Sequence, residues 1–242
     1  MTRNFVILSG GPGLYEPCDK ESHDTSWSNY VDNILLLASK GQFPSRTDEA
    51  VWWFVYEPAY VARWADDVKE KRASVSDVKK KGSSSYKDHL QKRAAKYGWN
   101  LRWLAAGSDF WSKLKTFRDP ISRVWYFGHA RDDLWLSLNH TKCVAERPAA
   151  DALVRRTDIV SQIALRAKFQ PGVGAYDPDR SSRFYGCNTA TFAADFAKAF
   201  GVYSEGAQGK VDFATAHPNG GKVDALRAGC TWKIYNTTGA AL

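Results

Sequence analysis

The stretch 123–136, RVWYFGHARDDLWL, decides the fold of this chain. Its apolar run Val124–Phe127 leads directly into Gly128 and His129, after which the sequence becomes polar. A run that is apolar on both faces is typical of a central strand in a parallel sheet that helices cover. The stretch therefore predicts a buried strand that carries a histidine at its carboxyl end.

Three further apolar runs end at a glycine, a proline or a polar turn. They are Asn4–Ser9, Val51–Tyr56 and Arg183–Tyr185, the last of which leads to Gly186. Helical periodicity or helix start and stop residues mark four other segments, Ser26–Gly41, Glu57–Arg72, Asp151–Phe169 and Asn188–Gly201. Two C-terminal segments, Lys210–Pro218 and Cys230–Tyr235, have the pattern of additional strands.

The alternation of strands and helices predicts an α/β fold, a three-layer sandwich with a mostly parallel central sheet and right-handed crossovers. No linker-like segment interrupts residues 1–242, so we expect one domain. Residues 66–98 are rich in lysine and arginine, and we expect them to form a basic helical insertion with a turn at Ser83–Ser85.

Composition narrows the class of protein. Hydrophobic residues make up 44% of the 242 residues, which favours a folded chain. No apolar run approaches the roughly 20 residues of a membrane-spanning helix, so we expect no membrane span. The apolar run near the N-terminus is too short for a secretory signal. We therefore expect synthesis in the cytoplasm and, for a secreted protein, an export route without a cleaved signal peptide.

The four cysteines, Cys18, Cys143, Cys187 and Cys230, have neither the spacing of zinc ligands nor that of a disulfide framework. We expect no cofactor and no bound metal. The net charge of +8 would attract an anionic partner. However, only Tyr86 and Tyr97 interleave with the basic residues of 66–98, whereas nucleic-acid surfaces usually combine basic and aromatic residues. We do not expect a nucleic-acid partner.

Two reactive side chains follow predicted strands. His129 comes after Gly128, and Cys187 comes after Gly186 at the start of a predicted helix. In open α/β sheets, ligands bind beyond the carboxyl ends of the strands. A helix N-terminus favours a thiolate, and an imidazole can accept the thiol proton and later protonate a leaving amine. The pair predicts a Cys–His dyad, with backbone N–H groups at Gly128 and Gly186 binding an oxyanion.

The motifs YFGHA (126–130) and FYGCNTATFAADFAKAFGV (184–202) resemble those of the caspase-like, clan CD, cysteine peptidases, especially bacterial CHAT-like domains. The resemblance covers about residues 120–215. It implies a caspase-like fold and a peptide or protein substrate, with Cys187 as the nucleophile and His129 as the general base and acid. The backbone of Ala130 would join the oxyanion site, at a position where the family usually has glycine.

Such enzymes often place an acidic residue in the pocket for the side chain before the scissile bond. The candidates are Asp177 and Asp179, just before the cysteine strand, and Asp132, just after the histidine. The alternative is that the two residues beside Pro178 are turn-forming. The basic chain also suggests a bacterial effector toxin, which would have an immunity or carrier protein as a partner.

Two other readings stay open. The chain could be a non-enzymatic binding module that docks an anionic partner through residues 66–98, with Cys187 as a structural residue. It could also be a metal-dependent hydrolase in which His23 and Asp19 or Asp24 hold the metal ion. His140 and Cys143 form an isolated pair that lacks further ligands.

Overall fold

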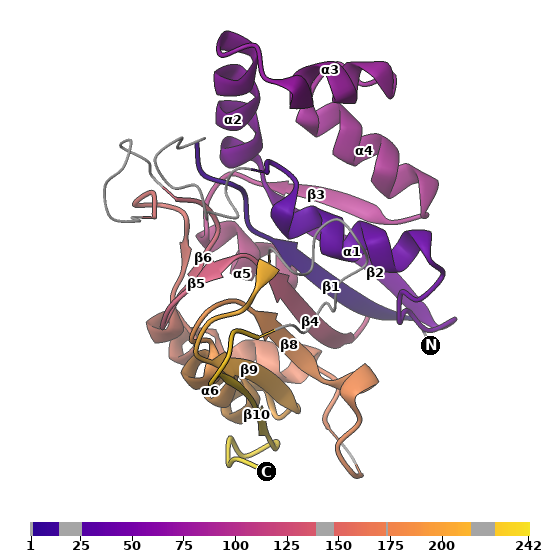
Figure 1. Cartoon of the computed structure of the whole chain (residues 1–242). Helices are drawn as coiled ribbons and strands as arrows, with labels where there is room; N and C mark the ends of the chain where they lie inside the picture. Colours follow the sequence, from indigo (N-terminus) through magenta and orange to yellow (C-terminus); the bar gives the residue numbers. More distant parts are fainter. Residues whose placement is uncertain (1, 15–25, 139–147, 173, 214–225) are drawn as a thin grey trace.

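The computed structural model describes residues 2–14, 26–138, 148–172, 174–213 and 226–242. The chain forms an α/β three-layer sandwich around a seven-stranded sheet (Figure 1). The strand order is β10-β9-β8-β4-β1-β2-β3, and all neighbours are parallel except β9 and β10. This confirms the predicted fold class.

The strands of this sheet are β1 (Arg3–Ser9), β2 (Glu49–Tyr56), β3 (Asn100–Leu104), β4 (Ile121–Phe127), β8 (Ser182–Tyr185), β9 (Ser204–Gln208) and β10 (Thr231–Tyr235). A small second sheet contains β5 (His129–Ala130), β6 (Leu134–Trp135) and β7 (Leu153–Val154). The helices are α1 (Asn29–Ser39), α2 (Glu57–Lys69), α3 (Ala73–Lys80), α4 (Tyr86–Lys96), α5 (Ser108–Lys115) and α6 (Ala190–Phe200). Three 3₁₀ helices are η2 (Arg156–Asp158), η3 (Val160–Lys168) and η4 (Pro178–Arg180).

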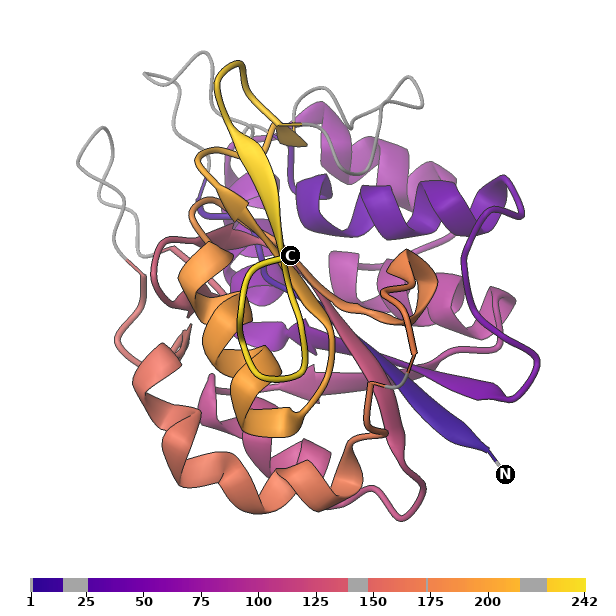
Figure 2. The same cartoon turned by 90° about the horizontal axis from the view of Figure 1, so that it is seen from below.

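The two faces of the sheet are covered by different helices. Figure 2 shows α1 and α4 on one side of the strands and α6 and η3 on the other. On the α6 side, the ring of Phe184 lies 5.0 Å from those of Phe192 and Phe196. On the α1 side, Phe5 and Trp125 meet edge to face at 5.2 Å. Both faces of the central strands are therefore buried, which explains their uninterrupted apolar runs.

The basic insertion is helical, as predicted. Residues 66–98 contain the end of α2 and all of α3 and α4, and Ser83–Ser85 joins the last two helices. The buried carboxylate of Asp67 holds them together, since it accepts hydrogen bonds from Arg63 at 2.9 Å and from the hydroxyl of Tyr86 at 2.6 Å. Lys79, Lys80 and Lys81 are exposed at the end of α3.

Two sequence predictions were wrong. Within the predicted helix Asp151–Phe169, the chain forms β7 and then the tighter helices η2 and η3. The described part of Lys210–Pro218 is not a strand, because Val211 makes only an isolated bridge with Leu226. Strand β9, just before it, takes that place beside β8.

Among the described residues, no helix combines the length and the apolar character that a membrane crossing requires.

Candidate active site

The carboxyl ends of β4 and β8 lie side by side. The two strands pair in parallel with Phe127 opposite Tyr185, and the N–H of Gly128 donates to the carbonyl of Tyr185 at 3.3 Å. His129 and Cys187 follow this last pair by two residues each, His129 in β5 of the second sheet and Cys187 in the turn after β8. Neighbouring strands are about 4.8 Å apart. The strand adjacency that a Cys–His pair requires is therefore present.

The last side chains of the two strands lie on the same face of the sheet. Side chains alternate along a strand, so residues 125 and 127 share one face, as do 183 and 185 in the neighbouring strand. The ring contacts of Tyr185 with Phe127 at 4.6 Å and with Trp125 at 5.8 Å show that the two series share the α1 face. His129 reaches α1 itself, which agrees with this alternation.

His129 is held by Tyr30, a residue that the sequence reasoning did not single out. The hydroxyl of Tyr30 lies 2.5 Å from Nε2 of His129, and the two rings meet edge to face at 5.0 Å. His129 is only 6% exposed and Tyr30 is fully buried. Tyr30 is itself fixed, since Ser9 donates to its carbonyl at 3.2 Å and Phe213 packs against its ring at 4.9 Å.

This contact restricts the tautomer of His129 that could act on a thiol. Nε2 is engaged by Tyr30. For Nδ1 to accept a proton from Cys187, the ring must be in the tautomer in which Nε2–H donates to the hydroxyl oxygen of Tyr30. The one feature of the sequence that could have pointed to Tyr30 is its position near the start of the helical segment Ser26–Gly41, which follows the first strand.

A sharp turn follows Cys187. Asn188 has φ +55°, a left-handed conformation that asparagine adopts more readily than most residues. The hydroxyl of Thr189 lies 2.7 Å from the carbonyl of Phe184 and 3.0 Å from that of Gly186, and accepts from the N–H of Ala207 at 3.0 Å. Helix α6 starts at Ala190, slightly later than predicted. The turn thus fixes Cys187 just ahead of the helix N-terminus.

The two glycines of the motifs are required for packing. A Cβ at Gly128 would lie 2.3 Å from the hydroxyl of Tyr126, and a Cβ at Gly186 would lie 2.6 Å from the Cβ of Ala130. The N–H of Gly186 donates to the carbonyl of Phe184 at 3.0 Å, and that of Gly128 is also engaged. The predicted oxyanion role is therefore corrected for both glycines, because their N–H groups bond to carbonyls.

Ala130 fits its position without strain. It is buried in β5 opposite Leu134, and Lys71 and Asn188 are the only non-glycine residues with positive φ in the described part of the chain. Position 130 therefore does not need glycine in this fold. Its methyl group fills the space that Gly186 leaves open.

The buried Tyr126 lies within electrostatic reach of Cys187. The hydroxyl of Tyr126 donates to the carbonyls of His129 and of Trp135, the latter at 2.7 Å. The pKa of Tyr126 is raised well above 10.0, mainly by burial and further by the negative charge of Cys187. Tyr126 thus bonds to the backbone of His129 and also interacts electrostatically with Cys187.

The predicted specificity residues lie elsewhere. Asp177 and Asp179 flank η4, at the amino end of β8, whereas Cys187 follows the carboxyl end of this four-residue strand. Strand β8 separates them by roughly 13 Å, at about 3.3 Å per residue. The prediction for both residues was wrong.

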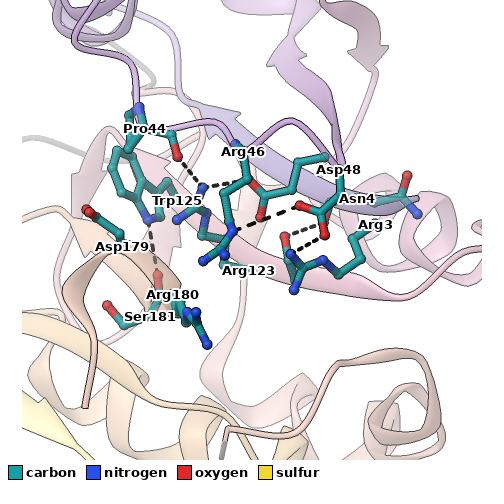
Figure 3. A network of polar contacts seen from close by, with 12 residues as sticks. Arg3, Asn4, Pro44, Arg46, Asp48, Arg123, Trp125, Asp179, Arg180 and Ser181 are labelled. Atoms are coloured by element: carbon teal, nitrogen blue, oxygen red, sulfur yellow. Dashed lines mark hydrogen bonds and ion pairs between the residues drawn. The ribbon is translucent and has the colours of Figure 1, made fainter. Parts of the chain in front are cut away.

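At the amino edge these residues serve the fold. Figure 3 shows Asp179 near Ser181, whose carbonyl accepts a hydrogen bond from the indole of Trp125 at 3.1 Å. Asp177 accepts from the N–H of Asp179 at 2.9 Å and pairs with Arg180 at 3.0 Å, as a turn-forming residue does. Asp132 is exposed in the turn between β5 and β6, close to His129 along the chain. Its role in substrate binding stays a prediction.

Across the described ranges, no group of three histidine, cysteine, aspartate or glutamate side chains could hold a metal ion. The candidates Asp19, His23, Asp24, His140 and Cys143 lie outside the described residues.

Comparison with known proteins gives no relative. No protein-family model matches the chain, and no curated protein or solved structure is significantly similar to it.

Proposed function

We propose that this chain is a cysteine hydrolase that cleaves a peptide or other amide bond, with Cys187 as the nucleophile and His129 as the general base and acid. The observation that supports the proposal is the parallel pairing of β4 with β8, which ends with Phe127 opposite Tyr185, two residues before His129 and Cys187. The resemblance of the two motifs to caspase-like peptidases agrees with this placement. The caspase-like family, the effector role and its immunity or carrier partner belong to the same proposal.

The reaction follows from the positions of these groups. Nδ1 of His129 takes the proton of the Cys187 thiol, and the thiolate attacks the carbonyl carbon of the scissile amide. The tetrahedral intermediate collapses when the C–N bond breaks, and the amine leaves with the proton from Nδ1. Water, deprotonated by the same nitrogen, then hydrolyses the thioester and restores the thiol.

Tyr30 acts in this scheme as a positioning residue. When His129 is protonated, both ring nitrogens carry a proton. Because His129 is only 6% exposed, Nε2–H needs an acceptor within the protein. The hydroxyl oxygen of Tyr30 lies at the required distance. A hydrogen bond to a charged group contributes about 1.5–3 kcal/mol, which favours the thiolate–imidazolium pair.

Hydrolysis of a library of quenched fluorescent peptides tests the proposal. We expect the reduced protein to cleave a subset of the peptides, and Cys187→Ala to abolish the cleavage without loss of the folded state. Cys230→Ala is the matched control and should retain cleavage. If Cys187→Ala cleaves the same peptides at the same rate, the dyad is not the catalytic group.

One observation favours a second function, the binding of an anionic partner. Lys79, Lys80 and Lys81 are all exposed at the end of α3. Binding to heparin-coated resin that is lost when these three residues are changed to glutamine, but unchanged in Cys187→Ala, would support this function.

A further inference from the structure

Cys230 lies on the same row of the sheet as Cys187. Strands β8 and β9 pair with Phe184 opposite Gly206, and β9 and β10 pair with Thr231 opposite Gln208. Extending both registers places Gly209 opposite Cys187 on one side and opposite Cys230 on the other. The N–H of Asn188 donates to the carbonyl of Gly209 at 2.7 Å, as a parallel register at this point requires.

The residue between the two cysteines has no side chain, and the sulfur of Cys230 fills its place. A Cβ built on Gly209 would lie 2.3 Å from Sγ of Cys230. The N–H of Lys210 donates to this sulfur at 3.1 Å, which holds the sulfur against the backbone that follows β9. Sγ of Cys230 therefore stands about one strand spacing, roughly 5 Å, from the position of Cys187. Both cysteines are half-buried and neither is in a disulfide.

Closing the remaining distance requires a backbone shift of Cys230. The two Cα atoms are two strand spacings apart, about 10 Å, and a disulfide needs about 4.4–6.8 Å. Cys230 ends a turn in which its N–H donates to the carbonyl of Arg227 at 3.1 Å, and residues 227–229 are exposed. Strand β10, which follows, is at the edge of the sheet. Exposed turns at an edge shift at little free-energy cost.

From this arrangement we infer that Cys230 is a resolving cysteine that forms a reversible disulfide with Cys187 when a hydroperoxide oxidises the protein. The Cys187 thiolate attacks the peroxide oxygen, the O–O bond breaks, and Cys187 becomes a sulfenic acid, while the leaving hydroxide or alkoxide takes a proton from solvent and departs as water or an alcohol. The thiol of Cys230 then attacks the sulfenic sulfur, the S–S bond forms, and a water molecule carries away the hydroxyl group and the thiol proton.

The disulfide would switch the enzyme off and protect it. A sulfenic acid that meets no thiol is oxidised further to sulfinic acid, which is irreversible in most proteins. The bond to Cys230 stops this step, and a thiol reductant restores Cys187. The regulatory consequence rests on the proposed role of Cys187 as the nucleophile, whereas the bond itself rests on the geometry alone.

Peptide mass spectrometry after treatment with hydrogen peroxide tests the inference. In a Cys18→Ser/Cys143→Ser background, we expect a peptide cross-linked through Cys187 and Cys230 and at least a tenfold loss of Cys187 alkylation by iodoacetamide. Dithiothreitol should reverse both. In Cys230→Ser and in Cys230→Ala, we expect Cys187 to react with dimedone and then to accumulate as sulfinic acid.

Two results would overturn the inference. One is peroxide oxidation of Cys187 without any Cys187–Cys230 peptide. The other is equal accumulation of sulfinic acid with and without Cys230. These readouts do not depend on hydrolysis. A protein that forms the disulfide but cleaves no peptide contradicts the proposed function alone, and one that cleaves peptides but forms no disulfide contradicts only this inference.

Discussion

The replacement Tyr30→Phe isolates one contact of the candidate site. It removes the hydroxyl that lies 2.5 Å from Nε2 of His129 and keeps the ring that packs on Phe213 at 4.9 Å. The protonated imidazole then loses a hydrogen bond worth about 1.5–3 kcal/mol, and the neutral imidazole loses one worth about 0.5–1.5 kcal/mol. Only the difference, about 1–1.5 kcal/mol, favours the protonated form. Because 1.36 kcal/mol corresponds to a tenfold change, the thiolate–imidazolium pair should become roughly 5- to 13-fold less populated at neutral pH.

The assay is the second-order rate of alkylation of Cys187 by iodoacetamide between pH 5 and 9, read by mass spectrometry. We expect Tyr30→Phe to react about 5- to 13-fold more slowly at pH 7 and to approach the wild-type rate only at alkaline pH, where the thiol ionises without the imidazolium. Tyr86→Phe is the matched control. Its hydroxyl is also buried but donates to Asp67 at 2.6 Å, so the variant should lose stability and keep the alkylation rate.

One result would refute this reasoning. If Tyr30→Phe is folded and its alkylation rate follows the wild-type curve at every pH, the contact with Nε2 does not support the dyad. An equal slowing in Tyr30→Phe and Tyr86→Phe would show instead that the effect comes from a general loss of stability.

Three further predictions concern the fold around the site. Gly186→Ala should lower the free energy of unfolding by about 1–3 kcal/mol, because its methyl group would lie 2.6 Å from that of Ala130. In a double-mutant cycle measured by urea unfolding, Ala130→Gly should restore part of this loss. Additive losses would contradict the contact. Glu49→Gln should lower the free energy of unfolding by about 3–5 kcal/mol, because it leaves the buried Arg123 without its charged partner. Asp48→Asn, which removes the more exposed pair with Arg3, should change it by at most about 1 kcal/mol. Equal effects of the two substitutions would contradict the assigned burial. Burial and nearby positive charges lower the pKa of His89 below 6.5, so the unfolded state binds its proton first and stability should fall as the pH drops below about 6.5. The melting temperature of His89→Gln should fall less than that of the wild type between pH 7 and pH 5, and an identical fall would contradict the direction of this shift.

The central strands could be predicted from sequence because burial on both faces gives an unbroken apolar run. Strand β9 could not, since its sequence SEGAQ has no apolar pattern and its neighbours β8 and β10 determine its place. The predicted helix Asp151–Phe169 contains the 3₁₀ helix η3, whose apolar residues Val160 and Ile163 are exposed and do not face a core.

The adjacency of the strands that precede His129 and Cys187 could be predicted, because two parallel strands of one sheet present their carboxyl ends at one edge. The error with Asp177 and Asp179 has the opposite cause. They are close to Cys187 along the chain, but the four-residue strand β8 lies between them and Cys187, so they are at the opposite edge of the sheet. The contact of Tyr30 with His129 joins residues that are 99 positions apart, and no local pattern encodes such a contact.

The central claim is that His129 activates Cys187. Alkylation of the native protein with one equivalent of iodoacetamide at pH 7 tests it directly, with Cys230 as the internal reference, since both thiols are half-buried. We predict that Cys187 is modified at least tenfold faster than Cys230 and that His129→Ala removes this difference while the protein stays folded. Equal rates at the two cysteines in the wild type, or an unchanged rate at Cys187 in His129→Ala, would contradict the claim.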